Sequence, residues 1–183
     1  MSLPRSSLPS EVRVRRARIE DAATLAALGA RTFADAYREL IPEEELGCYV
    51  AQSFSLEQIR GELGATGSTF LIAERETDAV GYARLLEQAP PGVDAATRAT
   101  RLVRIYVDQS RVRGGVGSLL MQACLEQARP RGRESLWLRV WEENRSAIAF
   151  YEKWRFAKVG TLEFDMLGEV RTDWIMQVGA DPE

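Results

Sequence analysis

The sequence contains no histidine and only two cysteines. Without histidine, the chain has no imidazole for a catalytic triad or a general base, and it lacks the commonest ligand of zinc. Cys48 and Cys124 lie far apart, without the Cys-x-x-Cys spacing of redox and metal motifs. Cys124 falls on the apolar face of an expected helix, where cysteine serves as a small buried residue. We therefore expect no metal site and no thiol chemistry.

Lysine is scarce as well. Of the 24 basic residues only Lys153 and Lys158 are lysines, and the arginines are scattered along the sequence. The net charge is −3 and the isoelectric point is near 5.3. Because proteins that bind nucleic acids or anionic membranes typically carry a basic excess, we expect neither as a partner. We interpret the arginine bias as compositional, not as a phosphate-binding surface.

No hydrophobic run approaches the length of a membrane-spanning helix, and residues 1–10 (MSLPRSSLPS) lack the apolar centre of a signal peptide. We expect residues 1–10 to form a flexible leader and the protein to be cytoplasmic. The remaining length suits one hydrophobic core and is short for two, so we expect a single domain over residues 11–179. Trp137 and Trp141 share a face of one expected strand. A core position is favoured for that face, although a homodimer contact is compatible with it.

The spacing of apolar residues predicts a mixed α/β fold with helices covering a sheet. Strands are expected over residues 12–19, 69–74, 80–86, 102–107, 136–141, 156–164 and 171–178. Helices are expected over residues 21–40, from residue 43, over residues 55–63, from residue 116 to the break at Pro130, and over residues 144–154. Residues 75–79 are expected to join two antiparallel strands, and residues 89–99 to form a loop.

Residues 111–120 (RVRGGVGSLL) place three glycines between an apolar strand and a helix. The first amides of a helix have no intrahelical partner, and glycine lets a pyrophosphate approach them closely. The stretch matches neither a P-loop, which ends in Gly-Lys-Ser/Thr, nor a dinucleotide fingerprint, which needs a third glycine where Leu120 stands. On its own the stretch indicates either an anion cradle or a tight structural turn.

Residues 140–156 (VWEENRSAIAFYEKWRF) predict a later helix that starts at Asn144, an excellent N-cap residue. Ala147, Ile148 and Tyr151 follow at i+3, i+4 and i+7, so they lie along one helix face with Asn144. On its own this segment fits a capping asparagine and a half-buried tyrosine as well as it fits a binding face.

Together, the two segments resemble the GNAT superfamily of acyl-CoA N-acetyltransferases, in which V-x-G-V-G-x-L-L precedes N-x-x-A-x-x-F-Y-E-K by a strand. The resemblance covers roughly residues 12–178. It implies a mostly antiparallel, twisted central sheet flanked by helices in the order β-α-α-β-β-β-α-β-α-β-β. The segments RTFADAY (31–37), RIYVDQ (104–109), LWLRVWEENRSAIAFYEKWRF (136–156) and RTDWIM (171–176) further resemble the PaiA-type polyamine acetyltransferase branch.

The resemblance implies acetyl-CoA as the donor and direct attack by a primary amine through a tetrahedral intermediate. It implies that strand amides hold the pantetheine arm, that the glycine turn holds the pyrophosphate, and that Asn144 bonds the arm. The cofactor-binding residues that it implies are Ile105, Tyr106, Val107, Val112, Arg113, Gly114, Gly115, Val116, Gly117, Ser118 and Asn144. It also implies that Tyr151 faces the sulfur. A phenol with a pKa of about 10 is protonated at pH 7, so Tyr151 could return a proton to the leaving thiolate.

Three positions depart from the family's usual pattern. Val112 stands where the phosphate loop usually carries Gln or Arg, so we expect a cradle made mostly of backbone, with Arg111 or Arg113 adding charge. Arg155 stands where a glycine usually follows the helix. Because a side chain in a left-handed cap costs about 1 kcal/mol, we expect this helix to end in another way. Arg101 matches a glutamate that serves some family members as base, so that role is not inherited.

The general base stays open, because several tyrosines and carboxylates fall on the segments that line the acceptor side in this family. These candidates are Asp35, Tyr37, Glu39, Tyr82, Glu87, Tyr106 and Glu142. Acidic residues of the first helices (Asp35, Glu39 and Glu43–Glu45) suit a cationic polyamine, although acidic helix starts also serve stability alone.

We interpret the chain as an N-acetyltransferase that acts on a primary amine of a small molecule, with a polyamine-like acceptor as one option. The alternatives are a non-catalytic acyl-CoA-binding sensor and a protein or peptide N-acetyltransferase.

Overall fold

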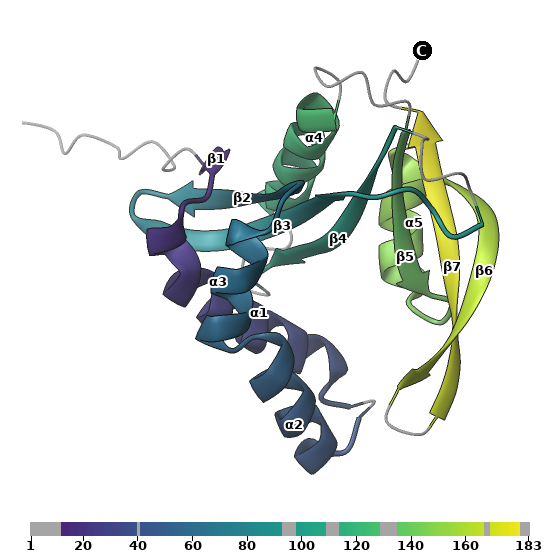
Figure 1. The fold of residues 1–183 in the computed structure, drawn as a ribbon, viewed down its shortest axis with the longest axis horizontal. Helices are drawn as coiled ribbons and strands as arrows, with labels where there is room; N and C mark the ends of the chain where they lie inside the picture. Colours follow the sequence, from purple (N-terminus) through teal and green to yellow (C-terminus); the bar gives the residue numbers. More distant parts are fainter. Residues whose placement is uncertain are drawn as a thin grey trace, which may run out of the picture.

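A computed structural model describes residues 12–39, 41–92, 98–108, 114–128, 135–166 and 169–179 (Figure 1). Its elements in chain order are β1 (Val12–Arg16), the 3-10 turn η1 (Ile19–Asp21), α1 (Ala22–Tyr37), α2 (Glu43–Ser53), α3 (Leu56–Gly64), β2 (Ser68–Arg75), β3 (Asp78–Glu87), β4 (Ala99–Val107), α4 (Val116–Ala128), β5 (Ser135–Trp141), α5 (Arg145–Lys153), β6 (Ala157–Met166) and β7 (Glu169–Gly179). The predicted α/β class is confirmed. The expected leader, residues 1–10, lies outside the described residues.

All these strands belong to one sheet in the order β1-β2-β3-β4-β5-β7-β6. Every neighbouring pair is antiparallel except β4 and β5, which run parallel. The parallel pairing covers only Ala99–Leu102 of β4, opposite Ser135–Leu138 of β5. Beyond that point the two strands diverge (Figure 1). The sheet is therefore mostly antiparallel, as expected, and it opens between β4 and β5.

Helices cover both faces of the sheet because the strand side chains alternate. In β2, Leu71 and Ala73 belong to the core beneath α4 and α5, whereas Phe70 and Ile72 belong to the core beneath α1–α3. Successive residues of a strand point to opposite faces, so a run of apolar residues such as TFLIA is buried on both sides. This run therefore serves two separate hydrophobic cores.

Two strand boundaries differ from the sequence-based expectation. The first strand ends at Arg16, because residues 19–21 form the turn η1. The fourth strand begins at Ala99 instead of residue 102, because its first residues pair with β3 on one side and β5 on the other. Three α-helices lie between β1 and β2, as the residue pattern predicts, whereas the element order implied by the family resemblance has two. The third, α3, is capped by Ser55, whose side chain accepts the Gln58 N–H at 3.1 Å.

Two core residues take the positions expected for them. Cys124 is fully buried, and burial raises the pKa of its thiol. Trp137 is also buried, where it packs with Ala99 and Ile175 and donates its indole N–H to the Gln88 carbonyl at 2.7 Å. In the part of the chain that the structure describes, no helix is long and apolar enough to span a membrane.

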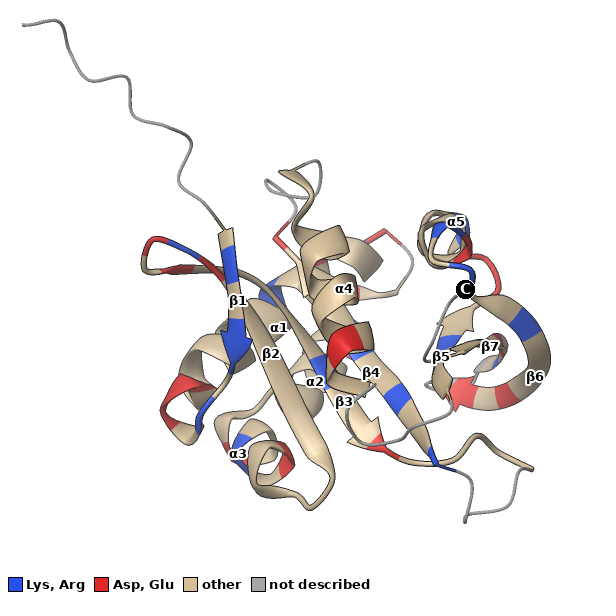
Figure 2. Cartoon of the chain, turned by 90° about the horizontal axis from the view of Figure 1, so that it is seen from above, with Lys and Arg blue, Asp and Glu red and all other residues tan. Residues whose placement is uncertain are grey.

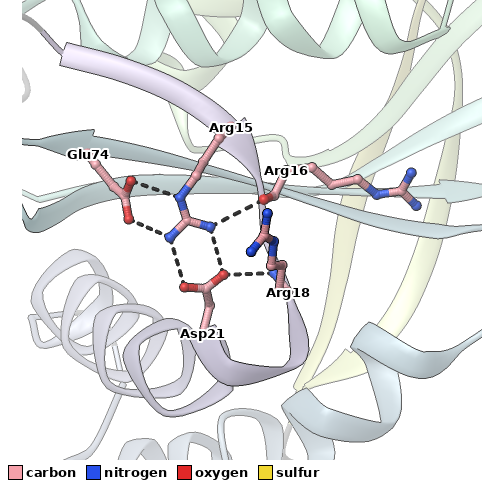
Figure 3. A network of polar contacts seen from close by, with 5 residues as sticks. All are labelled: Arg15, Arg16, Arg18, Asp21 and Glu74. Carbon is pink, nitrogen blue, oxygen red and sulfur yellow. Dashed lines mark hydrogen bonds and ion pairs between the residues drawn. The ribbon is translucent and has the colours of Figure 1, made fainter.

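A network centred on Arg15 joins β1, β2 and the start of α1 (Figure 3). The Arg15 guanidinium contacts both carboxylate oxygens of Asp21, at 2.8 and 2.9 Å, and also pairs with Glu74 of β2. Asp21 in addition accepts the Arg18 backbone N–H at 2.7 Å. These bonds, led by the one from Arg15, lower the pKa of Asp21 from 3.8 to about 2.

The helix α5 ends in a Schellman motif, so the expectation of a different ending was wrong. The Arg155 N–H donates to the Glu152 carbonyl at 2.9 Å, and the Phe156 N–H donates to the Tyr151 carbonyl at 3.1 Å. Arg155 itself adopts a left-handed conformation, with φ of 64°. The two backbone bonds and the burial of Phe156 hold this ending although its central residue is not glycine.

Replacing Asp21 with Asn removes the charge that pairs with Arg15 and should lower the free energy of unfolding at pH 7. The loss should be only about 1 kcal/mol, because the network is partly exposed to solvent. The folded-state pKa of Asp21 lies below its ordinary value, so its contribution is complete above pH 3.8 and is lost as the pH falls toward 2. Urea unfolding of both proteins between pH 6 and 2.5 measures this difference. Asp35→Asn, at the exposed pair with Arg38, is the control. A difference that stays constant with pH would contradict the assignment.

Replacing Arg155 with Gly should raise the free energy of unfolding by about 0.5–1 kcal/mol, because glycine adopts the left-handed conformation without strain. Arg145→Gly, at the exposed first turn of the same helix, should instead lower it by a similar amount. Urea denaturation of the two variants checks both signs. If Arg155→Gly destabilises the protein, contacts of the Arg155 side chain outweigh the backbone strain.

Candidate active site

A cavity of about 650 Å³ occupies the opening between β4 and β5. Its wall combines residues of α1 and α2 with residues of α4 and α5, which cover the opposite face of the sheet. The cavity therefore reaches from one face to the other through the gap where the two strands diverge. Residues 103–107 of β4 form one side of this gap.

Strand β4 has an open backbone edge along the cavity. The Asp108 N–H donates to the Val80 carbonyl of β3 at 2.9 Å. In an antiparallel pair such bonds alternate, so the backbone of Tyr106 also faces β3, whereas those of Ile105 and Val107 face the other way. Among the described residues, none of β5 pairs with β4 beyond Leu102. The edge at Ile105 and Val107 can therefore accept an extended chain as an added strand.

The glycine turn leads into α4 beside this edge. Gly115 has φ of +75°, a backbone conformation that residues with a side chain rarely adopt. The helix α4 begins at the next residue, Val116. The Val116 side chain is fully buried, so only its backbone is available to a ligand. Gly114 and Ser118 are exposed. Two further residues of the predicted cradle, Val112 and Arg113, lie outside the described residues.

Gly117 lines the cavity, and the packing of the chain does not explain why it is glycine. A Cβ atom built there would meet Phe150 at 3.6 Å and Val107 at 3.8 Å, which are ordinary contact distances. An alanine would therefore fit the protein. The missing Cβ leaves space at a helix N-terminus, where backbone N–H groups and the helix dipole favour an anion.

Asn144 caps α5, as its place in the sequence predicts. Its Oδ1 accepts the Ala147 N–H and the Ser146 hydroxyl, both at 3.1 Å. The Asn144 side chain lies near the hydroxyl of Tyr37 on α1, where it opposes the rise in the pKa of that phenol. Asn144 and Tyr37 both line the cavity, so α5 and α1 meet at its wall from the two faces of the sheet.

Tyr151 lies on the wall of the cavity and is 9% exposed. Burial raises the pKa of its hydroxyl, and the neighbouring Tyr37 and Cys124 raise it further. The phenol is therefore protonated at neutral pH. Its hydroxyl has no hydrogen-bond partner among the residues described, so it remains available as a donor.

Of the seven candidate bases from the sequence, only Tyr37 and Tyr106 line the cavity. Burial raises the pKa of both phenols, which keeps them protonated and unsuited to accept a proton at neutral pH. Tyr82 is fully buried in the core under α1–α3. The four carboxylates Asp35, Glu39, Glu87 and Glu142 are exposed and do not line the cavity.

Asp173, which is not among the seven candidates from the sequence, is the one carboxylate in the described part of the cavity wall. Burial raises its pKa, although Arg139 and Arg101 oppose the shift. Arg139 contacts only its Oδ2 atom, at 2.9 Å, so Oδ1 has no hydrogen-bond partner among the described residues. A carboxylate with a raised pKa and a free oxygen can exchange a proton with a bound amine.

The arginines that look scattered in the sequence converge in the fold. Five lie on the face of the sheet that carries α1–α3: Arg84 of β3, Arg101 and Arg104 of β4, Arg139 of β5 and Arg171 of β7. All but Arg84 line the cavity. Basic positions along β4 are visible in Figure 2. Burial lowers the pKa of Arg101, and the positive charges of Arg139, Arg84 and Arg104 lower it further.

One signal for this set was present in the sequence. In β5, Trp137, Arg139 and Trp141 alternate with Leu136, Leu138 and Val140, which predicts that the two groups face opposite ways. The alternation does not reveal that β7 pairs with β5, which places Asp173 opposite Trp141 and next to Arg139.

The fold is similar to those of solved acetyltransferases. The crystal structure of the PaiA N-acetyltransferase from Thermoplasma acidophilum in complex with coenzyme A matches with a TM-score of 0.74 at 21% identity. The match covers 92% of this chain and 99% of that one. The likeness confirms the GNAT-type arrangement of sheet and helices that the sequence predicted.

Sequence comparisons agree with the fold. An uncharacterised N-acetyltransferase of Mycobacterium tuberculosis is 30% identical over 156 residues, which are 85% of this chain and 96% of the relative. Another, from Lactobacillus delbrueckii subsp. lactis, is 24% identical over 151 residues, 82% of this chain and 87% of the relative. The acetyltransferase (GNAT) family matches residues 32–156. The chain is therefore a member of the GNAT family of acetyl-CoA-dependent N-acetyltransferases.

Proposed function

We propose that the protein transfers an acetyl group from acetyl-CoA to the primary amine of a small molecule. The observation that carries this proposal is that Gly117 of the glycine turn, Tyr151 and Asp173 line the same cavity. Its volume of about 650 Å³ lies within the ordinary range for small-molecule sites. A concave site of this volume is the shape that small-molecule sites have.

The residues around the cavity fit coenzyme A. The amides of Gly115, Gly117 and Ser118 at the start of α4 would hold the pyrophosphate, and the space above Gly117 leaves room for it. The open edge of β4 at Ile105 and Val107 would hold the pantetheine arm with backbone bonds alone. Asn144 would bond the same arm from α5. When bound, acetyl-CoA supplies the activated acetyl thioester.

Tyr151 would act as the general acid. Its hydroxyl keeps its proton at neutral pH and lies at the cavity wall, where it can donate that proton to the departing sulfur. A backbone N–H of Ile105 or Val107, on the open edge of β4, would polarise the thioester carbonyl. Neither role requires a histidine.

Asp173 would accept the proton of the acceptor's ammonium group. Its Oδ1 atom is free of hydrogen bonds to the described residues, and Arg139 fixes the orientation of the carboxylate through Oδ2. The raised pKa of Asp173 makes it a better proton acceptor than an exposed carboxylate. Tyr37 and Tyr106 would line the same side as protonated phenols.

The direct test is thiol release from acetyl-CoA in the presence of amines of different size and charge. Mass spectrometry of each reaction identifies an acetylated product. We expect transfer to at least one class of small amine. Tight binding of coenzyme A without transfer to any small amine or peptide would instead favour a sensor, and transfer to peptides alone would favour a protein acetyltransferase.

Replacing Gly117 with Ala should weaken the binding of coenzyme A about 10-fold without lowering stability. The new methyl group meets no protein atom closer than 3.6 Å, but it fills the space proposed for the pyrophosphate. Isothermal titration with coenzyme A and thermal unfolding measure the two effects. Gly47→Ala, at an exposed position on α2 with open space around it, is the control. Unchanged affinity in Gly117→Ala would place the pyrophosphate elsewhere.

Replacing Tyr151 with Phe should lower kcat by about 100-fold and leave the Kd of acetyl-CoA nearly unchanged, because only the proton donor is lost. Steady-state kinetics at saturating acetyl-CoA and titration of the cofactor separate the two quantities. Tyr82→Phe removes a hydroxyl that is buried outside the cavity and should leave kcat unchanged. An unaltered kcat in Tyr151→Phe would show that another group protonates the sulfur.

A further inference from the structure

The acceptor side of the cavity carries more positive than negative charge. Four guanidinium groups, those of Arg84, Arg101, Arg104 and Arg139, interact with one another across β3, β4 and β5. Two carboxylates face them. Glu62 of α3 pairs with Arg84 at 2.8 Å and with Arg104 at 2.6 Å, and Asp173 pairs with Arg139 at 2.9 Å. The cluster therefore retains an excess of two positive charges.

Arg101 is the member of this cluster that has no carboxylate partner among the described residues. Its guanidinium donates to the neutral side-chain oxygen of Gln88, at 3.3 Å. Its Nε atom is buried and has no hydrogen-bond partner within the described part of the chain. A buried donor without a partner is rare in folded proteins, and an anion at this place would satisfy it.

Aromatic rings hold the guanidinium planes in place. Arg101 stacks on Trp137 at 5.2 Å and Arg139 stacks on Phe164 at 5.2 Å, measured to the ring centroids. Stacking occupies a face of the guanidinium and leaves its N–H edge for a planar, bidentate partner. A carboxylate has the matching geometry.

The same charges oppose a polyamine. A cationic chain would enter a cavity whose wall holds Arg101, Arg104 and Arg139 but only Asp173 as a carboxylate among the described residues. The acidic residues of the first helices, which suggested a polyamine in the sequence, are exposed and lie outside the cavity wall: Asp35, Glu39, Glu43, Glu44 and Glu45. They therefore give no support to a cationic acceptor.

We propose that the acceptor is an amino-acid-type compound, a primary amine that also carries a carboxylate, and that Arg101 binds this carboxylate. The inference rests on the proposed acetyltransferase function and specifies its substrate class. The ammonium group of the acceptor faces Asp173, and the carboxylate faces the N–H edge of Arg101. The two residues lie on the wall of the same cavity and interact electrostatically, so one small zwitterion can contact both.

Matched pairs of acceptors test the proposal. Each pair joins an α-amino acid with its amide and with the amine that lacks the carboxyl group, for side chains of several sizes. Spermidine and short peptides complete the panel. We expect kcat/KM for the best amino acid to exceed that of its amide and its decarboxylated amine by at least 10-fold.

Variants of Arg101 identify the binding group. Arg101→Gln should raise KM for the amino acid about 10- to 100-fold while changing KM for the amide less than 3-fold, because only the carboxylate contact is lost. Arg101→Lys keeps the charge and should restore part of the difference. Arg60→Gln, at an exposed position on α3, is the control for charge alone. Thermal unfolding of each variant establishes that it is folded.

Binding measurements distinguish failure of this inference from failure of the proposed function. The amino acids and amides are titrated into protein saturated with coenzyme A. Transfer that favours spermidine or the decarboxylated amines would overturn the inference and leave the acetyltransferase function intact. Absence of transfer, with amino-acid binding that Arg101→Gln abolishes, would support the carboxylate site and contradict the function. Absence of both transfer and binding would overturn both.

Discussion

The short parallel pairing of β4 with β5 is the constraint on which the rest of the site depends. The two strands share only four residues each before they separate. A longer ladder would close the sheet, satisfy the outer edge of β4 and leave no cavity. Because the ladder stops at Leu102, the backbone of Ile105 and Val107 stays open, and α4 and α5 from one face meet α1 and α2 from the other at the same gap. The cost is a strip of unpaired backbone, which a bound chain would satisfy.

The arginine cluster needs carboxylate partners, because buried charges are costly unless they are paired. Glu62, which is 7% exposed, pairs with Arg84 and Arg104, and it accepts a hydrogen bond from the Gln58 side chain at 3.1 Å. Glu62 comes from α3, the helix that the sequence predicts over residues 55–63. α3 therefore holds two arginines of the sheet in fixed positions and leaves Arg101 as the group that can bind a ligand. Such an arrangement favours specificity at some expense of stability.

The parts of this site that depend on local sequence could be predicted, and those that depend on strand pairing could not. The glycine turn and the Asn144 cap arise from residues within one turn of helix, where propensity and hydrogen bonding decide. The convergence of Arg101, Arg139 and Asp173 depends on the placement of β7 beside β5. These positions lie up to 72 residues apart in the numbering, and no local pattern links them. The prediction for the end of α5 was wrong for another reason: backbone hydrogen bonds and the burial of Phe156 outweigh the local strain at Arg155.

The positions of the positive and negative side chains in the cavity connect the proposed substrate with the proposed chemistry. Arg101 stands on β4, and the carboxylate in the described part of the cavity wall comes from Asp173 on β7. With a glutamate on β4, the strand beside the open edge would attract the ammonium group. With Arg101 there, β4 attracts the carboxylate, and the ammonium group is directed toward β7. In the proposed site, two opposite charges on separate strands would orient the acceptor, and a zwitterion is the class of amine that would satisfy both.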